Sequence, residues 1–263
     1  VVPILAKIAE NPEGKGELER VLKTNPPWRA GFFRGLKKGI SDARTPLNLF
    51  LALQNTSAAS TPEERSEYIQ FLVDRGLYDV AYYTWLQFLP DDQLSSLGDL
   101  FNGNFEVAPS GVPFDWSFSN QAGVIVEVTD HPDADGHALF MKLGPGRVNF
   151  GDIQQTVVLP AGKYRFQGLS KIDLLSKKGL FWQVTCIGAP KAKASSGPIG
   201  RGPTIEGRDL AWNRFSFDFT VPNTDCPAQS VRLSSAARAA SDQFMSGSVW
   251  FDDLEITRET AGQ

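Results

Sequence analysis

The chain has 263 residues, 41% of them hydrophobic, and a formal net charge of -4 at pH 7. That length and composition suffice for one large core or two smaller ones, which argues against intrinsic disorder. Neither charge sign dominates a long stretch, so nothing indicates nucleic acid as a partner. No run reaches the roughly 20 apolar residues that a membrane span needs, and the start at Val1 lacks the features of a signal peptide. We therefore expect no membrane span in this chain, and leave open what precedes Val1.

The first 97 residues carry apolar side chains at helical spacing, interrupted by prolines. This pattern predicts four or five short helices. Thr61 and Pro62 mark a strong helix start, because Thr61 can accept a hydrogen bond from the first turn and Pro62 suits the first helical position. We expect this helix to end at Gly76.

A helical hairpin is predicted from Tyr68 to Pro90. Its packing residues stand at the spacings of one tetratricopeptide repeat, which the segment resembles: Leu72, Gly76, Tyr78, Ala81 and Trp85. The resemblance implies a tetratricopeptide-like helical domain over residues 1–97, whose stacked hairpins offer a surface to a protein partner. A plain helical bundle without a binding role is the alternative.

Past Leu97 the apolar residues alternate or form short β-branched runs, and Gly and Pro become frequent. Strands without intervening helices predict an antiparallel β-sandwich or barrel over residues 98–263. The Ser-, Gly- and Pro-rich stretch 191–209 is predicted to be a long surface loop. The predicted strands lie near 114–118, 124–129, 138–143, 153–159, 163–172, 180–186, 212–221, 231–235 and 248–257.

Several motifs in this second half occur in the order and spacing of a known family. They are Phe101-Asn102-Gly103-Asn104-Phe105-Glu106, Phe114-Asp115-Trp116, Gln154-Gln155, Leu159-Pro160-Ala161-Gly162-Lys163-Tyr164 and Val249-Trp250-Phe251-Asp252-Asp253-Leu254-Glu255-Ile256. With them the segment resembles the galactose-binding-like jelly rolls of carbohydrate-binding module families 4, 9 and 22. The resemblance implies a jelly-roll sandwich that binds a polysaccharide or oligosaccharide without cleaving it.

The same resemblance implies a structural calcium ion, held where the first and last strands of the jelly roll lie side by side. Carried over residue by residue, its ligands are the Glu106 carboxylate and one of Asp252 or Asp253, helped by backbone carbonyls near Asn102 and Asn104. Hard oxygen ligands suit calcium, and two adjacent aspartates otherwise repel each other. The alternative is that these carboxylates are solvated or accept from backbone amides.

Sugar sites on such sandwiches use aromatic rings, because the apolar face of a pyranose stacks on them while polar groups bond its hydroxyls. Successive strand residues face opposite sides, so Phe181 and Trp182 cannot both point inward. Trp250 is a weaker candidate, because it lies near the strand of the predicted ion. The candidate aromatics are Trp116, Trp182 and Trp212, with Tyr164 and Phe181 as alternates, and the candidate polar partners are Gln155, Gln183 and Arg165.

Cys186 and Cys226 are the two cysteines of the sequence. Each lies near the end of a predicted strand, and adjacent strand ends can bring the pair together in a disulfide. Such a bond indicates an oxidising compartment, so we expect a periplasmic or secreted protein. The alternative is two buried thiols.

Enzyme signatures are weak in this sequence. His131 and His137 flank Asp133 and Asp135, but the spacing fits no metal signature, and Asp-Ala-Asp-Gly is typical of a hairpin tip. There is no Gly-x-Ser-x-Gly elbow, phosphate-binding loop or dinucleotide fingerprint. A glycosidase needs two facing carboxylates, a pairing across strands that sequence cannot show.

The resulting hypothesis is a non-catalytic carbohydrate-binding protein whose helical domain serves as scaffold or protein-interaction unit, in a process such as polysaccharide export or surface assembly. One alternative is a protein–protein adaptor with a purely structural sandwich. A glycan-active enzyme is the other.

Overall fold

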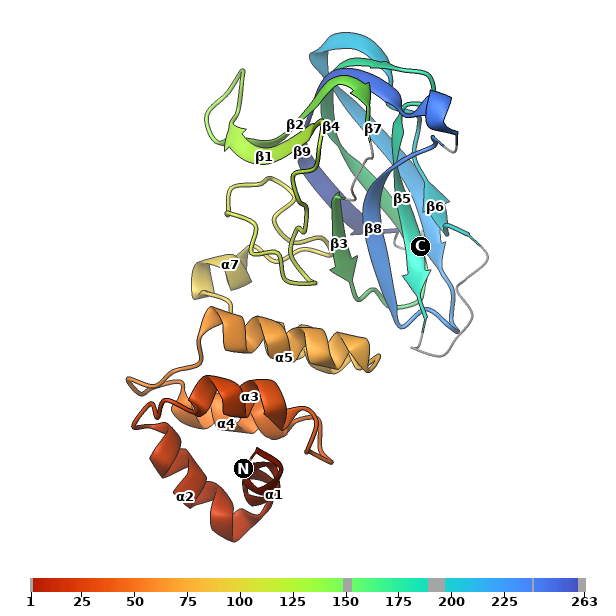
Figure 1. Cartoon of the computed structure of the whole chain (residues 1–263). Coiled ribbons are helices and arrows are strands. Elements are labelled where there is room, and N and C mark those ends of the chain that lie inside the picture. Colours follow the sequence, from red (N-terminus) through yellow and green to blue (C-terminus); the bar gives the residue numbers. More distant parts are fainter. Residues whose placement is uncertain (1, 149–152, 189–196, 238, 260–263) are drawn as a thin grey trace. The chain divides into compact units, whose positions relative to one another are not determined.

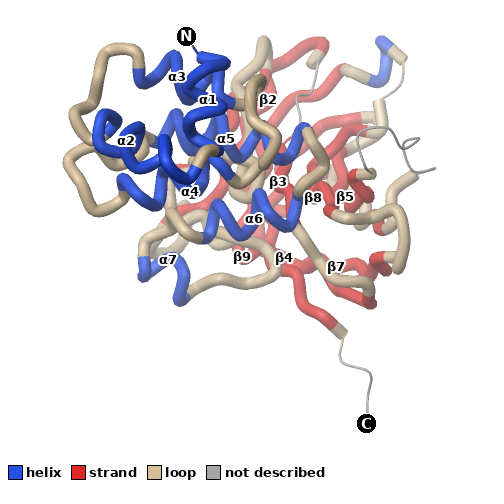
Figure 2. Tube along the Cα trace, turned by 90° about the horizontal axis from the view of Figure 1, so that it is seen from below, coloured by secondary structure: helices blue, strands red, loops and turns tan. Residues whose placement is uncertain are grey.

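The computed structural model describes residues 2–148, 153–188, 197–237 and 239–259. The chain divides into two compact units, Val1–Phe88 and Leu89–Gln263. The predicted boundary at residue 97 falls later than this division, because the short helix α7 (Asp91–Ser95) belongs to the second unit. The first unit is helical, and the described part of the second is almost wholly strand and loop (Figure 2).

Residues 2–97, all of them described, form seven helices rather than the four or five predicted, and six of the seven belong to the first unit. One boundary that the sequence pattern missed lies at Asn11, whose side chain accepts from Glu13 N at 2.9 Å and caps a helix that begins at Pro12. The helices, coloured red to orange in Figure 1, are α1 (Val2–Glu10), α2 (Pro12–Leu22), α3 (Arg29–Leu36), α4 (Thr45–Leu53), α5 (Pro62–Asp74) and α6 (Tyr78–Leu86).

Helix α5 begins and ends as its sequence predicts. Glu64 N donates to Thr61 Oγ1 at 3.2 Å, and Thr61 N donates back to the Glu64 carboxylate at 3.1 Å, which is a capping box. At the other end Gly76 adopts φ 74° and its N–H donates to Val73 O at 2.8 Å. Helix α6 then packs against α5. That this pair is a tetratricopeptide repeat stays a prediction.

One buried ion pair joins α3 to α5. The Arg29 guanidinium donates to both Glu64 oxygens, at 3.0 and 2.8 Å, and to the carbonyls of Ala58 and Ala59 at 2.7 and 3.1 Å. Because the guanidinium has a partner at each nitrogen, the charge is well compensated. Removing one partner of such a buried pair typically costs about 3–5 kcal/mol.

The described part of the second unit is an antiparallel sandwich of two sheets, ordered β1-β2-β9-β4-β7 and β3-β8-β5-β6 (Figure 1). Apolar residues alternating along the strands of both sheets form one continuous core, so the predicted sandwich is confirmed. Its strands are β1 (Val124–Asp130), β2 (His137–Arg147), β3 (Ile153–Val157), β4 (Gly162–Ser176), β5 (Leu180–Ile187), β6 (Gly200–Arg201), β7 (Gly207–Val221), β8 (Ala228–Ser235) and β9 (Phe244–Arg258).

The strand predicted at 114–118 is wrong, because this segment forms one isolated bridge, Ser117 to Gln154, and is otherwise coil. The reason is local. The Asp115 carboxylate accepts from Ser110 N and from Trp116 N, both at 2.7 Å, and these bonds compete with strand pairing. In the predicted loop 191–209, residues 191–196 lie outside the described residues, while β6 and the start of β7 occupy part of the rest.

The opening segment of the sandwich lies against its closing strand, although it is coil rather than strand. Leu254 N donates to Gly103 O at 2.9 Å, and a Cβ on Gly103 would lie 1.8 Å from Leu254 O. Asn102 and Phe105 have left-handed φ values of 52° and 55°, which bend the segment away from an extended conformation. A glycine is therefore required at position 103 by close backbone approach.

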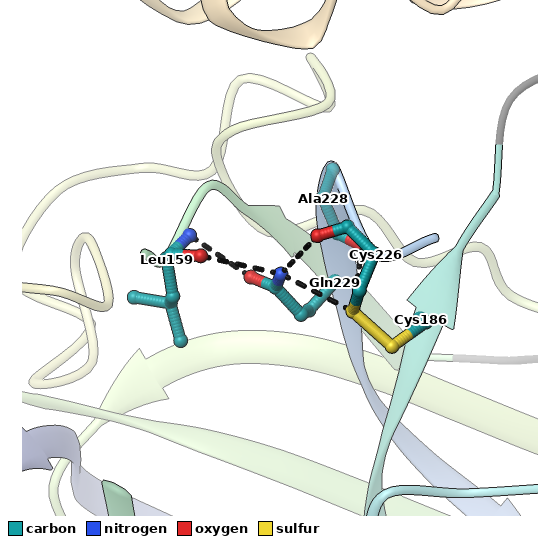
Figure 3. Close-up of a disulfide and its surroundings, with 5 residues drawn as sticks. All are labelled: Leu159, Cys186, Cys226, Ala228 and Gln229. Carbon is teal, nitrogen blue, oxygen red and sulfur yellow. Dashed lines mark hydrogen bonds between the residues drawn. A yellow bond between two sulfur atoms is a disulfide. The ribbon is translucent and has the colours of Figure 1, made fainter. Parts of the chain in front are cut away.

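The predicted disulfide is confirmed, since Cys186 at the end of β5 bonds to Cys226 (Figure 3). Beside it the buried Gln229 amide accepts from Leu159 N at 2.9 Å and donates to Cys226 O at 3.1 Å. These contacts hold in place the segment at Cys226 that leads into β8. On the chain-entropy model a bond closing a loop of 40 residues stabilises a fold by about 4 kcal/mol.

Candidate functional site: a row of side chains across the five-stranded sheet

The five-stranded sheet has two faces that differ in what covers them. Leu139, Met141 and Phe251 are fully buried in the core between the sheets. Because strand side chains alternate, the intervening Phe140 and Trp250 project from the opposite, outer face. Both are half-buried, although no part of the second sheet covers that face.

The register places one side chain from each strand in a line across the outer face. Glu127 of β1 pairs with Phe140 of β2, Phe140 with Trp250 of β9, and Trp250 with Lys171 of β4. Trp212 of β7 completes the line, since its indole donates to the carboxylate oxygen that also accepts from Lys171. At the usual strand spacing these five residues, the outer row, span about 19 Å.

The aromatic members of the outer row keep defined positions. The rings of Phe140 and Trp250 lie 4.3 Å apart, centroid to centroid, with an interplanar angle of 37°. Trp212 is half-buried, and its ring is stacked on that of His131 at 4.7 Å and 17°. Three aromatic rings are thus held on one outward face by neighbouring side chains. A ligand that bound there would have to restrict their motion only a little further.

His131 belongs to the turn of residues 131–136 between β1 and β2, here called the hairpin strap. The backbone bond from His131 N to Gly136 O, 2.9 Å long, closes the turn. Asp133 Oδ2 accepts from Lys171 Nζ at 2.7 Å and from Trp212 Nε1 at 2.8 Å. Because β4 and β7 lie on the far side of β9 from the β1–β2 hairpin, the strap must reach across the outer face. It forms a wall along one side of the outer row.

Asp133 and Asp252 have carboxyl groups with opposite pKa shifts. The hydrogen bond from Lys171, followed by that from Trp212, lowers the pKa of Asp133. Burial chiefly raises the pKa of Asp252 to about 6, with repulsion from Asp253 and Glu106 adding to it. His131 Nε2 lies 3.8 Å from Asp252 Oδ2 and opposes that rise. Asp133 is therefore ionised at neutral pH, whereas Asp252 titrates just below it.

Glu106 fixes the β2 end of the strap. Its carboxylate accepts from His137 N at 2.9 Å and lies 3.1 Å from His137 Nδ1, and these hydrogen bonds lower the pKa of Glu106. Gly136 permits this approach because it has no side chain: a Cβ there would lie 2.4 Å from Glu106 Oε1. Its φ of 96° also favours glycine at this position. A side chain at position 136 would displace the carboxylate.

A pocket of about 550 Å³, here called the edge pocket, lies beside the edge strand β1. Most of its lining is apolar, with Ala108, Phe118 and Val128 among the contributing side chains. Its polar lining comes from Glu106, Glu127 and His137. Glu127 is also a member of the outer row, but Val126 and Val128 of the lining face the core, so the pocket lies on the core side of β1.

Four of the residues predicted to bind sugar lie in the core instead. Trp116 and Trp182 are 0% and 1% exposed and pack against each other, and Tyr164 is equally buried. Gln155 is 1% exposed and bonds both backbone groups of Phe101, at 3.0 and 2.9 Å. Strand alternation turns Gln155, Tyr164 and Trp182 inward, where a ligand cannot reach them without opening the fold. Trp116 lies in coil, and it borders the edge pocket from within the core.

The other predicted residues are scattered. Gln183 bonds Ser234 Oγ at 3.0 Å on the four-stranded sheet, where Phe181 lies under the Arg201 guanidinium. Arg165 is on the outer face of β4, but it lies six residues along that strand from Lys171. Its guanidinium pairs with Asp218 at 2.7 Å. Of the predicted residues, Trp212 is in the outer row, and so is Trp250, the weaker candidate.

Sequence reasoning missed most of the outer row and the strap. A usable signal for Phe140 was its place between two apolar residues of an alternating strand, which predicts that an aromatic faces outward. Trp250 has the same signal beside Val249 and Phe251. No sequence signal shows that Asp133, in a turn read as an ordinary hairpin tip, reaches Lys171 and Trp212.

The predicted calcium ligands are near one another but are already engaged. The Asn102 backbone carbonyl accepts from Trp116 Nε1 at 2.9 Å and from Phe105 N at 3.2 Å, and Glu106 accepts from His137. Among the described residues no group of three or more His, Cys, Asp and Glu is arranged to hold a metal ion. This donor set does not fit calcium as it stands, although the mutual repulsion of Glu106, Asp252 and Asp253 favours a cation. Calcium stays a prediction.

The helical unit has a cleft of its own, about 580 Å³ in volume. The paired Arg29 and Glu64 line it together with Arg34 and Glu67, whose side chains approach to 3.4 Å. Because these charges neutralise one another, we assign no ligand to this cleft.

No family model matches the chain, and no curated protein matches it. Among solved structures, one titled as a CBM4 module is 14% identical with a TM-score of 0.41, covering 61% of this chain and 99% of the other. A protein of Bacteroides thetaiotaomicron described as sugar-binding is 9% identical, TM-score 0.44, covering 62% and 100%. The CBM22-1 xylan-binding domain of Paenibacillus barcinonensis is 15% identical, TM-score 0.39, covering 61% and 94%. Likenesses this distant do not identify a family, so the chemistry of the site must come from its own side chains.

None of the helices in the described residues is both long and apolar enough to cross a membrane.

Proposed function

We propose that the sandwich binds a carbohydrate chain laid along the outer row, and that it does so without cleaving the chain. The observation that carries this proposal is the row itself: Phe140, Trp250 and Trp212 share one outward face with Glu127 and Lys171. Aromatic rings offer flat apolar surface to the C–H face of a sugar, while charged side chains bond its hydroxyls.

The charges along the row disfavour an acidic ligand, because its cation Lys171 is paired and the Glu127 carboxylate is exposed. Lys171 is paired with Asp133 at 2.7 Å, so neither presents an uncompensated charge. Both still have unused hydrogen-bonding capacity, because a carboxylate accepts up to about four bonds and an ammonium donates three. Sugar hydroxyls both donate and accept and can use these positions.

The hairpin strap gives the row one closed side. His131 covers one face of the Trp212 ring, so a sugar meets this indole by its other face or its edge. A chain is therefore expected to enter from the side of Ile125 and Lys142, the residues next along β1 and β2 on the outer face.

Retention on immobilised polysaccharides tests the proposal. We expect the folded protein to be retained by at least one member of a broad panel and the double variant Phe140→Ala/Trp250→Ala to lose this retention. The matched control is Phe244→Ala, which removes a 54% exposed aromatic from the same strand outside the row. Retention by no glycan, or equal retention of the double variant, would contradict the proposal.

A glycosidase is the second candidate, favoured by the opposite pKa shifts of Asp252 and Asp133. We favour binding without catalysis, because Asp133 is committed to Lys171 and Trp212 and Asp252 is 16% exposed beneath the strap. Recovery of the bound glycan at its original chain length supports this choice, whereas release of reducing ends that Asp252→Asn abolishes would establish the enzyme.

We also propose a periplasmic or secreted location, supported by the disulfide Cys186–Cys226. The role of the helical unit as scaffold or protein-interaction unit is likewise a proposal. Thiol labelling of protein from its native compartment tests the location, since modification of both cysteines without prior reduction would contradict it.

A further inference from the structure

We infer that one end of the sandwich is a lipid-binding tip, which attaches the protein to anionic phospholipid surfaces. The tip consists of two exposed apolar side chains, Leu175 of β4 and Phe244 of β9, and of three cations beside them, Arg147, Lys177 and Lys178. This inference goes beyond the proposed function, because the tip lies outside the outer row and its ligand is not a glycan.

The two apolar side chains of the tip project from the outer face of the five-stranded sheet. The residues next to them in the strands, Leu174 and Met245, are 1% and 2% exposed, so strand alternation turns the pair outward. Leu175 is 77% exposed and Phe244 is 54% exposed. Leu175 pairs with Ser246, which places Phe244 diagonally across the two strands, about 7–8 Å away. Single exposed apolar residues are common on proteins, whereas two adjacent ones form a patch.

The three cations flank this pair on both sides. Arg147 of β2 pairs with the first residue of β9, and Lys177 and Lys178 follow β4 directly in the turn to β5. All three are exposed, and no ion pair among the described residues includes any of them. The next outward carboxylate on β4 is that of Asp173, which lies 3.8 Å from the Arg208 guanidinium. The tip therefore carries uncompensated positive charge.

The turn that carries the two lysines is fixed by hydrogen bonds. Ser176 Oγ accepts from Lys178 N at 3.3 Å and from Gly179 N at 2.9 Å. Leu180 N donates to Ile205 O at 3.0 Å, and Ile205 N donates back to Leu180 O at 2.7 Å. Because the turn is held on both sides, binding at the tip requires little further ordering of the backbone.

This combination of side chains suits the interface of a lipid bilayer. Leucine and phenylalanine leave water when they enter the boundary between headgroups and acyl chains. Lysine and arginine have long apolar stems and hold their charges at the level of the anionic headgroups. A stable contact with another protein buries about 800 Å² on each partner, which is a larger surface than two side chains provide. We therefore assign the tip to a lipid surface.

Co-sedimentation of the full chain with vesicles tests the inference. We expect binding to vesicles of equal parts phosphatidylglycerol and phosphatidylcholine, and much weaker binding to phosphatidylcholine alone. Leu175→Ser/Phe244→Ser should lower the partition coefficient at least about tenfold, because two apolar side chains no longer leave water. Lys177→Gln/Lys178→Gln should also lower it about tenfold and weaken its dependence on salt. The matched control is Leu51→Ser, which replaces a 40% exposed leucine of the helical unit and should bind as the parent does.

A dye attached at the tip reports directly on which residue enters the lipid. The two cysteines of the chain are bonded to each other, so Leu175→Cys can be labelled at that position alone. We expect an environment-sensitive dye there to shift its emission to shorter wavelength on the mixed vesicles. The same dye on Leu51→Cys should emit as it does in water.

Several results would overturn the inference. They are failure to bind the mixed vesicles, equal binding to both vesicle types, and an unshifted dye on Leu175→Cys. A change from dimer to monomer in Leu175→Ser/Phe244→Ser would overturn it too, by assigning the tip to a contact between copies of this chain. The comparison of vesicle types on the unmodified chain decides even where a variant fails to fold. Because the serine variant keeps the outer row, we expect it to retain glycan binding, so this inference and the proposed function fail separately.

Discussion

The two faces of the five-stranded sheet carry similar residues in different surroundings. On the inner face, Phe166 and Phe251 pack on Trp182 at 5.5 and 5.3 Å between ring centroids and are fully buried. On the outer face, Phe140 and Trp250 are half-buried among charged neighbours. Aromatic type alone therefore does not single out a candidate binding residue; strand parity and the chemistry of the neighbouring side chains must be considered with it.

The largest expected effect is a loss of stability when an aromatic residue of the inner face is truncated. Phe251→Ala leaves a cavity against Trp182, and truncations of this kind typically cost about 3–5 kcal/mol of unfolding free energy. Urea denaturation measures it, with Phe244→Ala as the exposed control expected to change little. A loss below about 1 kcal/mol would mean that the inner face is not close-packed as described.

Trp250→Ala tests the outer face at the adjacent position of the same strand. We expect glycan affinity to fall by about 2 kcal/mol, or roughly 30-fold, as for a central aromatic contact. The unfolding free energy should fall by only about 1 kcal/mol, because the ring is half-buried. Calorimetric titration and urea denaturation on one preparation measure both. The reverse pattern, with stability lost and affinity kept, would assign Trp250 to the core.

Asp133→Ala sharpens the comparison by releasing the strap from the outer face. Without the bonds to Lys171 and Trp212, the strap and the indole lose their fixed positions, and we expect a several-fold loss of glycan affinity with a faster off-rate. Asp135→Ala, in the same strap and similarly exposed, is the control. If both variants bind as the parent does, the strap is not a wall of the site.

The smallest expected effect concerns pH. Because the pKa of Asp252 is raised to about 6, its protonated form stabilises the fold; this contribution is complete below about pH 4 and is lost as pH rises through 6. Asp252→Asn should therefore raise the unfolding free energy at pH 8 by about 1 kcal/mol after allowance for solvent screening, and change nothing at pH 4. Melting curves in chelator at the two pH values measure this, and an equal effect at both would contradict the raised pKa.

The same melting curves test calcium. If Glu106, Asp252 and Asp253 hold the ion, adding calcium to chelator-treated protein raises the melting midpoint, and Asp252→Asn abolishes the rise. An unchanged midpoint would remove the ion from this site.

Local features of the fold followed from the sequence, whereas most long-range contacts did not; the disulfide between Cys186 and Cys226, 40 residues apart, is an exception. The capping box at Thr61 depends on residues three apart, and the alternation of Leu139 and Met141 sets the face of Phe140. By contrast, the burial of Trp116 and Trp182 depends on how two sheets meet. Asp133 and Trp212 are 79 residues apart, and only the sheet order brings them together. The strand predicted at 114–118 was wrong because the Asp115 carboxylate accepts hydrogen bonds from nearby backbone N–H groups.

The disulfide has a practical consequence for any assay of this molecule. It joins β5 to the approach to β8, both in the four-stranded layer, whereas every member of the outer row stands on the other layer. Thiol reagents in a buffer thus act on the layer opposite the proposed glycan surface. Loss of retention under such conditions would report melting of the protein rather than damage to that proposed surface.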